Sequence, residues 1–399
     1  MTTIGVLGGR WRATVSAAGS IAPWDGTPAL DWFVAADDRW HIPAQEAAVR
    51  QIRLEGAPVL ETRVRVPNGD AVQRVWCVAD QGGFTVIEIE NDSSLPFAVA
   101  FNRPDVLSTR PPASVPIEGI SLPTGSVVFP VGHRSVVQFA LTHTSGVLAL
   151  PTGLAPAAQV ARGWMTTVDR AGRILVPDDA LASEIVRLRV ELALNGPVDP
   201  NDDPVGFLID VGQLVRLGER SESWVPDVVD AVEAAARLSP RGGAQAWDVQ
   251  AALDAGALVL HRSGEQRALR DLARLRLPST LALPSTVSDH RRLAWHELAL
   301  ARSTGGGQAD LLAGGIPPSW LGANFEVYDL PIGPASTVSY AVRWHGDRPA
   351  VLWETSGPTL ALKASCVAPE WSSALPSGEA LWPAPTVDPE LFSPGASFS

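Results

Sequence analysis

Acidic side chains near helix-like segments have the clearest potential for chemistry in this chain. Asp202-Asp203 leads into one segment with helical periodicity, Asp248 opens another, and Glu297 lies inside a third. A pair of carboxylates can act as general acid and base or can hold a calcium ion. We therefore take Asp202, Asp248 and Glu297 as candidate catalytic residues. An aspartate at the start of a helix is also a common N-cap, and that alternative stays open.

Glu297 has a histidine neighbour and arginines nearby. With His296 beside it, Glu297 could act as a general acid. A surface ion pair with Arg292 or Arg302 is the alternative that helix spacing favours. A zinc-protease helix would need a second histidine four residues after His296, and that position is Leu300. No metal site is predicted.

Tryptophan is unusually common, with 14 residues against two tyrosines. Several tryptophans stand close to aspartate or histidine. Ring faces beside carboxylates suit a sugar, because the ring stacks on C–H groups and the carboxylate accepts from hydroxyls. The same rings could simply fill a core. The candidate ligand-binding residues are Trp24, Asp25, Trp32, Trp40, His41, Trp247 and Trp344.

The composition excludes several classes of protein. Lys363 is the only lysine among 31 lysine and arginine residues, which is typical of GC-rich bacterial coding. A Gly-Lys-Ser/Thr phosphate loop is absent, and Gly5 to Gly9 do not make a dinucleotide fingerprint. No cofactor is predicted.

The charge and hydropathy argue for a soluble protein. The net charge of -12 opposes long-range attraction to nucleic acid or anionic lipid. The chain has no apolar run near the roughly 20 residues of a membrane helix, and its N-terminus does not read as a secretion signal. We expect a cytoplasmic protein with no nucleic-acid partner and no membrane partner.

The order of sequence patterns is β, then α, then β. Residues 59–66 and 70–78 alternate around Asn68-Gly69, which is a strong hairpin signal. Residues 84–90 alternate again, and further strands fit 95–101, 126–130 and 135–142. Together they predict an antiparallel β-sandwich over residues 1–165, with loops at 104–125 and 151–163.

Helical periodicity follows. It predicts a first helix from about residue 178, and further helices over 204–217, 225–238, 246–262, 265–275 and 288–302. Short separators favour helical hairpins, so residues 178–305 are expected to form an all-α domain. Short strands from residue 325 predict a small antiparallel β meander over 316–382, and a Pro/Ser-rich flexible tail covers 383–399. The expected class is therefore α+β with several domains.

Two stretches carry a resemblance. One is the 59–101 meander, ending in Val-Ile-Glu-Ile-Glu-Asn-Asp-Ser. The other is the Pro317–Gly322 segment followed by residues 338–344. With the β–α–β layout, they resemble the glucoamylase-like and glycoside-phosphorylase-like carbohydrate enzymes, which have a β-sandwich, a toroid of helical hairpins and a C-terminal β layer. The helical part here is about half the usual size, and none of the family's catalytic carboxylates matches a position in this chain.

The resemblance implies a carbohydrate-processing protein with a saccharide or glycoside as its substrate or ligand. If it is a glycoside hydrolase, one carboxyl protonates the leaving oxygen and a second activates water or attacks. The alternative is a non-catalytic saccharide-binding or protein-interaction module with a degenerate toroid. A homodimer through the helical domain is the third expectation.

Overall fold

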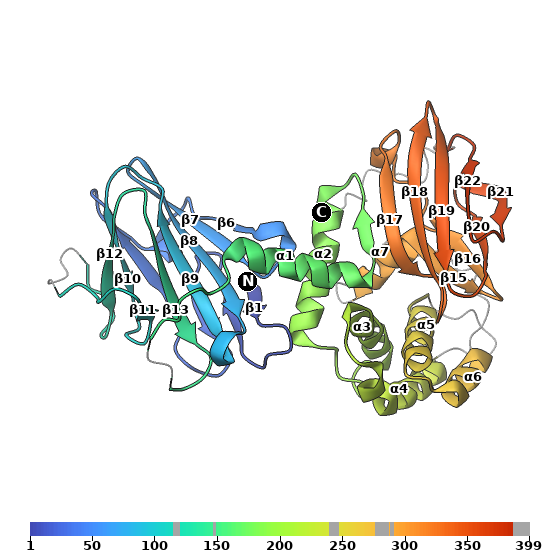
Figure 1. Cartoon of the computed structure of the whole chain (residues 1–399), viewed down its shortest axis with the longest axis horizontal. Coiled ribbons are helices and arrows are strands. Elements are labelled where there is room, and N and C mark those ends of the chain that lie inside the picture. The colour runs from blue at the N-terminus through green and yellow to red at the C-terminus, as the bar shows by residue number, and fades with distance from the viewer. Residues whose placement is uncertain (115–119, 147–148, 239–246, 276–286, 288–290, 386–399) are drawn as a thin grey trace. The chain divides into compact units, whose positions relative to one another are not determined.

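The chain folds into two compact units in the computed structural model (Figure 1). Unit 1 comprises Met1–Thr166 and unit 2 comprises Thr167–Ser399. The structure describes residues 1–114, 120–146, 149–238, 247–275, 287 and 291–385. Strands precede helices and strands follow them, so the predicted α+β class is confirmed.

The described strands of unit 1 form three antiparallel sheets with orders β1-β2-β3, β12-β10-β4-β5 and β11-β13-β9-β8-β7-β6. The strands are β1 (Thr2–Gly5), β2 (Arg12–Val15), β3 (Ile21–Pro23), β4 (Trp32–Ala35), β5 (Trp40–His41), β6 (Arg50–Arg53), β7 (Leu60–Val66), β8 (Gly69–Val78), β9 (Phe84–Asn91), β10 (Phe97–Phe101), β11 (Leu107–Ser108), β12 (Val127–Val131) and β13 (Val136–Thr142).

One apolar core joins these sheets. Phe101 and Phe129 come from the four-stranded sheet, and Phe139 comes from the six-stranded sheet. The ring of Phe139 lies 4.9 Å from that of Phe101 and 4.8 Å from that of Phe129, between ring centres. All three are buried, and burial of one such ring contributes about 1.5–3 kcal/mol. The sheets therefore pack as a β-sandwich.

The predicted hairpin is present. Strand β7 ends at Val66, which pairs with Gly69 at the start of β8. Asn68 has a positive φ of 61°, which asparagine tolerates better than most residues. A Cβ atom on Gly69 would lie 2.0 Å from the Asp92 carbonyl oxygen, so only glycine fits there.

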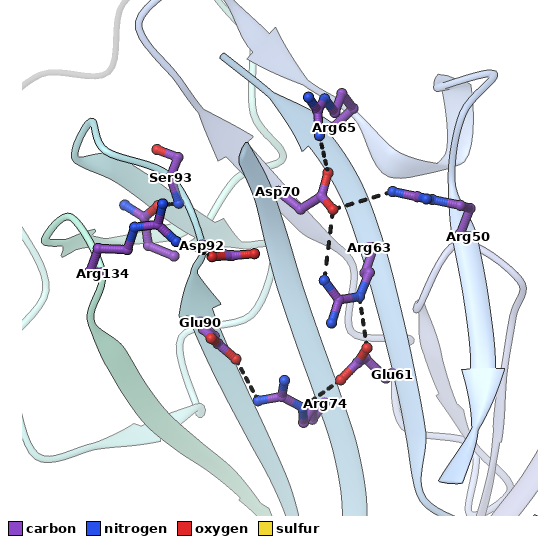
Figure 2. A network of polar contacts seen from close by, with 11 residues as sticks. Arg50, Glu61, Arg63, Arg65, Asp70, Arg74, Glu90, Asp92, Ser93 and Arg134 are labelled. Atoms are coloured by element: carbon purple, nitrogen blue, oxygen red, sulfur yellow. Dashed lines mark hydrogen bonds and ion pairs between the residues drawn. The ribbon is translucent and has the colours of Figure 1, made fainter. Parts of the chain in front are cut away.

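The outward side chains of β6 to β9 form a network of ion pairs (Figure 2). Glu61 is buried between Arg63 and Arg74, with 2.7 Å from each arginine Nε to a carboxylate oxygen. Asp70 faces Arg50, Arg63 and Arg65 at 3.2, 3.7 and 3.4 Å. Since each of these acids already faces at least two arginines, the network ties the strands together.

Unit 1 also contains a stacked aromatic pair, Trp11 and His143. The Trp11 ring lies 3.8 Å from the His143 ring, centre to centre, at an interplanar angle of 9°. His143 Nε2 lies 2.9 Å from Thr85 Oγ1. Burial lowers the pKa of His143 to about 4, a direction that nearby Arg12 reinforces and Asp25 opposes. The histidine is therefore neutral in the folded protein at neutral pH.

This histidine predicts a pH-dependent stability. Between about pH 4 and pH 6.5 the unfolded chain binds a proton at His143 and the folded chain does not, so stability rises with pH in this window. Replacing His143→Gln should remove about 2 kcal/mol of that rise. Urea unfolding at a series of pH values measures it, with the exposed His133→Gln as the control. Parallel pH profiles for wild type and His143→Gln would contradict the prediction.

Unit 2 begins in helix and ends in strands. Its helices pack into one apolar cluster dominated by α3, α4 and α5, while the strands build a second cluster with parts of α2 and α7. The helices are α1 (Ala157–Val168, across the unit boundary), α2 (Asp179–Asn195), α3 (Pro204–Leu217), α4 (Val225–Leu238), α5 (Trp247–Arg262), α6 (Gln266–Leu275) and α7 (Arg292–Leu300).

The described strands of unit 2 form a five-stranded sheet, β14-β17-β18-β19-β22, and a four-stranded sheet, β15-β16-β20-β21. The C-terminal β region is therefore larger than the expected meander, and β16 pairs with β20 in parallel. The strands are β14 (Arg173–Leu175), β15 (Ala301–Gly305), β16 (Gln308–Leu311), β17 (Phe325–Pro331), β18 (Thr337–His345), β19 (Arg348–Ser356), β20 (Ala361–Ala364), β21 (Ala368–Ser373) and β22 (Ser377–Leu381).

Two expected segments are wrong. The loop expected at 151–163 becomes α1 from Ala157, because Pro156 suits the entry to a helix and alanines and glutamine follow. The last helix ends at Leu300 instead of Arg302, and Ala301–Gly305 pairs with β16 as a strand. Its expected start at 288 lies outside the described residues.

The separation of residues 178–305 from 316–382 stays a prediction. Both segments lie in one compact unit, although each contributes to its own core cluster. Most of the tail expected from residue 383 falls outside the described part of the chain.

Candidate functional site

A cavity lies within unit 2, between α3, α5, α7 and the first strand after α7. Its empty volume is about 640 Å³, including the part open to solvent. The walls are mostly apolar, and such a cavity with a few polar groups is the usual form of a small-molecule site. The apolar wall residues are Ile209, Ala251, Ala255, Leu258, Ala294, Leu298, Ala301 and Pro331, and the polar ones are Gln213, Arg216, Asp254, Glu297 and Ser303.

Small residues set the shape of this cavity. A Cβ atom on Gly212 of α3 would lie 2.7 Å from the Cβ of Ala255 on α5. The two helices therefore approach closely at this point, and any side chain at position 212 would force them apart. Gly333, just after β17, lines the cavity from the sheet side.

Helix α7 places Glu297 against this cavity. Leu293 and Leu300 of α7 belong to the core of the strands, while Ala294 belongs to the core of the helices. Glu297 is buried, with 5% of its surface exposed. The helix thus lies between the two apolar clusters of unit 2 and carries its carboxylate at their border.

Three buried side chains bind the Glu297 carboxylate. Arg189 of α2 donates from Nη2 to Oε1 at 2.6 Å. Gln213 Nε2 and Arg216 Nη1, both on α3, donate to Oε2 at 2.5 Å each. Arg189 is further held by the carbonyl oxygens of residues 168, 171 and 172. One carboxylate therefore links α2, α3 and α7.

The environment keeps Glu297 ionised. Burial alone would raise the pKa of its carboxyl group, but the charges and hydrogen bonds of Arg216 and Arg189 outweigh burial and lower it. A carboxyl with a lowered pKa carries no proton at neutral pH. Glu297 is therefore unsuited to donate one as a general acid.

The expected surface ion pair of Glu297 with Arg292 or Arg302 is wrong. Glu297 turns inward to arginines 81 and 108 residues away in the sequence. Arg292 pairs with Glu184 of α2 at 2.8 Å, and Arg302 lies 3.5 Å from Asp310. Helical spacing could not reveal this, because tertiary packing decides which face of α7 is buried.

Two polar atoms in the cavity wall lack a hydrogen-bond partner within the described residues. They are Arg216 Nη2 and Gln213 Oε1, and both side chains are more than nine-tenths buried. A buried donor or acceptor without a partner costs about 1–3 kcal/mol. Both residues line the cavity, but the two unpartnered atoms themselves have almost no accessible surface.

Sequence reasoning missed Gln213 and Arg216, although a signal was present. In the otherwise apolar segment Pro204–Leu217, the polar residues Asp210, Gln213 and Arg216 recur every three positions. That spacing places them close to one face of a helix. Polar residues in a buried helix need partners, so this face was a candidate site.

The other two candidate catalytic residues lie elsewhere. Asp202 is exposed in the loop before α3, and it does not line the cavity. Asp248, near the start of α5, lies 3.1 Å from Arg291 Nε. Arg291 also binds Asp203, the N-cap of α3, at 3.1 Å. Asp203 and Asp248 therefore share one arginine at two helix starts, while Glu297 alone of the three candidates meets the cavity.

The candidate sugar-binding residues of unit 1 divide into two groups. Trp24 is 55% exposed, and its indole donates to Thr14 Oγ1 at 2.8 Å, with Asp25 exposed beside it. Trp32 is 2% exposed and belongs to the core. Only Trp24 and Asp25 of these three are accessible to a ligand.

Trp40 and His41 belong to a local polar cluster. His41 is buried, with Nδ1 3.1 Å from Glu46 and Nε2 3.0 Å from Asp38. Trp40 is partly buried. Both ring nitrogens of His41 therefore already contact carboxylates of neighbouring residues.

The two remaining tryptophans lie in unit 2. Trp247 begins α5 and is partly buried. Trp344 near the end of β18 is also partly buried, and its indole donates to the Ala323 carbonyl at 2.8 Å. Neither residue lines the cavity.

Comparison with protein-family models and with curated proteins finds no match. Within the described ranges, no helix is both long and apolar enough to cross a membrane. The described residues likewise contain no group of three or more histidine, cysteine, aspartate or glutamate side chains that could hold a metal ion.

Replacing Glu297→Gln should destabilise unit 2 by about 3–5 kcal/mol. The change leaves two buried guanidinium groups without the carboxylate that they share. Leaving these charges unpaired costs more free energy than is gained by no longer burying the carboxylate charge. Chemical unfolding measures the loss. The exposed Glu233→Gln is the matched control, since its pair with Arg237 lies in solvent. A loss below about 1 kcal/mol for Glu297→Gln would show that the carboxylate does not hold the helices together.

Asp210 of α3 has a pKa shift opposite to that of Glu297 on α7. Burial raises its pKa to about 6, the nearby Asp203 adds to this rise, and a hydrogen bond from the Val198 amide and the charge of Arg291 oppose it. The folded protein therefore holds this proton more tightly than the unfolded chain. Stability falls as the pH rises from about 4 to about 6.

Replacing Asp210→Asn should flatten this fall and stabilise unit 2 by about 1–2 kcal/mol at neutral pH, because the amide needs no proton to be buried. Asparagine Oδ1 can still accept from the Val198 amide. Unfolding curves at several pH values test this, with the exposed Asp202→Asn as the control. A variant less stable than wild type at neutral pH would show that the Asp210 charge is favourable.

Proposed function

We propose that unit 2 binds a small organic molecule in the cavity beside Glu297. The observation that carries this proposal is the mostly apolar cavity with two fixed polar side chains, Arg216 and Gln213, in its wall. Apolar walls with a few fixed polar groups are what a binding site for such a molecule needs. The hydrogen bonds to Glu297 fix the positions of both polar side chains before a ligand arrives.

Carbohydrate processing is the second candidate function. Two carboxylates, Asp254 and Glu297, line the same cavity, which is the pairing that a glycoside hydrolase requires. Such a hydrolase also needs one carboxyl that keeps its proton near neutral pH, and Glu297 is not that group. No tryptophan is among the residues that line the cavity. These facts favour binding over hydrolysis.

The exposed Trp24 and Asp25 support a saccharide-binding role for unit 1 as a separate proposal. A cytoplasmic location, which we also propose, would make the ligand of the unit 2 cavity an intracellular metabolite. A homodimer through the helices of unit 2 remains a prediction.

Narrowing the cavity tests the binding function. Gly333 lines the cavity, and a Cβ atom on it would meet no atom closer than 3.7 Å, so Gly333→Leu should fold and reduce the space left for a ligand. Saturation-transfer NMR with the full chain and a panel of small uncharged organic molecules should show binding that Gly333→Leu weakens by about tenfold. The matched control is Gly163→Leu. Gly163 is an exposed position of α1, and a Cβ atom there would meet nothing within 4 Å.

The panel can also refute this function. Absence of binding by any molecule at millimolar concentration would do so. Binding that Gly333→Leu and Gly163→Leu leave equally strong would place the site elsewhere on the chain.

A further inference from the structure

The outer face of the five-stranded sheet in unit 2 carries exposed leucines. Strands β18, β19 and β22 are neighbours in this sheet (Figure 1). Val351 of β19 points inward to the core, so Leu352 beside it points outward, and it is 44% exposed. Leu381 of β22 is 49% exposed. An antiparallel sheet with one face in water usually carries polar side chains on that face.

The strand register gathers these leucines into one patch. Ala341 of β18 pairs with Leu352, and Ala350 of β19 pairs with Leu381. Paired residues of antiparallel strands point to the same face, and their Cβ atoms lie about 4.5–5.5 Å apart. The four residues are therefore adjacent on the outer face, and we call them the apolar patch. None of them lines the cavity of unit 2.

Opposite charges stand at the two ends of the apolar patch. The outward positions of β19 are Arg348, two patch residues and then Glu354, and both charged residues are exposed. Glu379 of β22 is the diagonal neighbour of Glu354 on this face. Arg348, Glu354 and Glu379 form no ion pair with any described side chain, whereas Arg343 and Glu326 of this face pair with each other. Arg348 is held in place by two carbonyl oxygens near the end of β22.

These charges distinguish between the possible occupants of the patch. Residues 383–399, which follow β22, contain two acidic residues and no basic one. Placing them on the patch would bring like charges to Glu354 and Glu379, which disfavours that segment. A second copy of the sheet meets the opposite condition. Each copy carries a cation at one end of the patch and carboxylates at the other.

We infer that the apolar patch is the interface of a homodimer in which the two β19 strands run in opposite directions. Arg348 of each copy then faces Glu354 of the other, and Leu352 of each copy packs against Ala350 of the other. A two-fold interface must be complementary to itself, and the order cation, apolar, apolar, anion becomes so when it is reversed. The interface uses the strands of unit 2 instead of its helices, and it requires no ligand in the cavity.

Sedimentation of the full chain at physiological salt tests the dimer. A monomer–dimer equilibrium should appear at concentrations up to about 200 µM, and a mass that stays that of one chain would overturn the inference. Leu352→Gln should weaken the dimer at least about tenfold, because each copy loses a leucine buried in the interface. The control is Leu7→Gln in unit 1, where Leu7 is 48% exposed. Equal dimerisation of Leu352→Gln and wild type would also overturn the inference.

Two charge reversals test the direction of the strands. Arg348→Glu places a carboxylate opposite Glu354 of the second copy, and Glu354→Arg places a guanidinium opposite Arg348, so each variant alone should dimerise at least about tenfold more weakly than wild type. An equimolar mixture of the two variants should recover the dimer, since every facing pair is then of opposite sign. A misfolded variant could not recover in this way. A mixture as monomeric as its components would contradict the proposed pairing.

Val229→Gln separates this interface from one through the helices. Val229 of α4 is 39% exposed, close to the exposure of the patch leucines. The variant should dimerise as wild type does. A dimer that Val229→Gln weakens and Leu352→Gln leaves intact would assign the contact to the helices and overturn the inference.

Discussion

The buried carboxylate of Glu297 holds unit 2 in its observed form. It takes hydrogen bonds from Arg189, Gln213 and Arg216, which belong to two other helices. Removing these charges from water costs several kcal/mol per ion, so the arrangement is favourable only when every partner is in place. Arg189 extends the link to the carbonyl oxygens that follow α1. The positions of α2, α3 and α7 are therefore coupled through one oxygen pair.

The cavity is a consequence of the same constraint. Glu297 needs two donors from α3, so the polar face of α3 must turn toward α7. At the same level of the helix, Gly212 brings α3 into close contact with Ala255 of α5. Space remains between the close contact and the polar network, and small residues such as Ala251 and Ala294 leave it unfilled.

Much of the fold could be predicted because it depends on local patterns. The Asn68-Gly69 turn, the strand pattern of Phe84–Asn91 and the cap before the helix at Pro204 are signals within a few residues, and the structure shows the hairpin, the strand and the cap at Asp203. The last helix shows two local signals in competition. Ala301 and Arg302 continue the helical pattern, but the hairpin with β16 makes Ala301–Gly305 a strand. The sequence pattern alone does not show whether helix or strand is the more stable at these residues.

The candidate site, like the fold, could be predicted from the sequence only in part. Glu297 could be recognised as a special residue because an acid in an apolar helix requires a partner, but the expected partners Arg292 and Arg302 were wrong. A general acid and an ion-pair anchor look alike in sequence, and what separates them is the identity of the neighbours. Asp210 and Glu297 illustrate this, since both lie in helices of unit 2 yet have opposite pKa shifts. Two arginines face Glu297, whereas burial dominates at Asp210. The two arginines that face Glu297 lie 108 and 81 residues away from it in the chain. Only the folded structure therefore shows that this carboxylate is held in ion pairs.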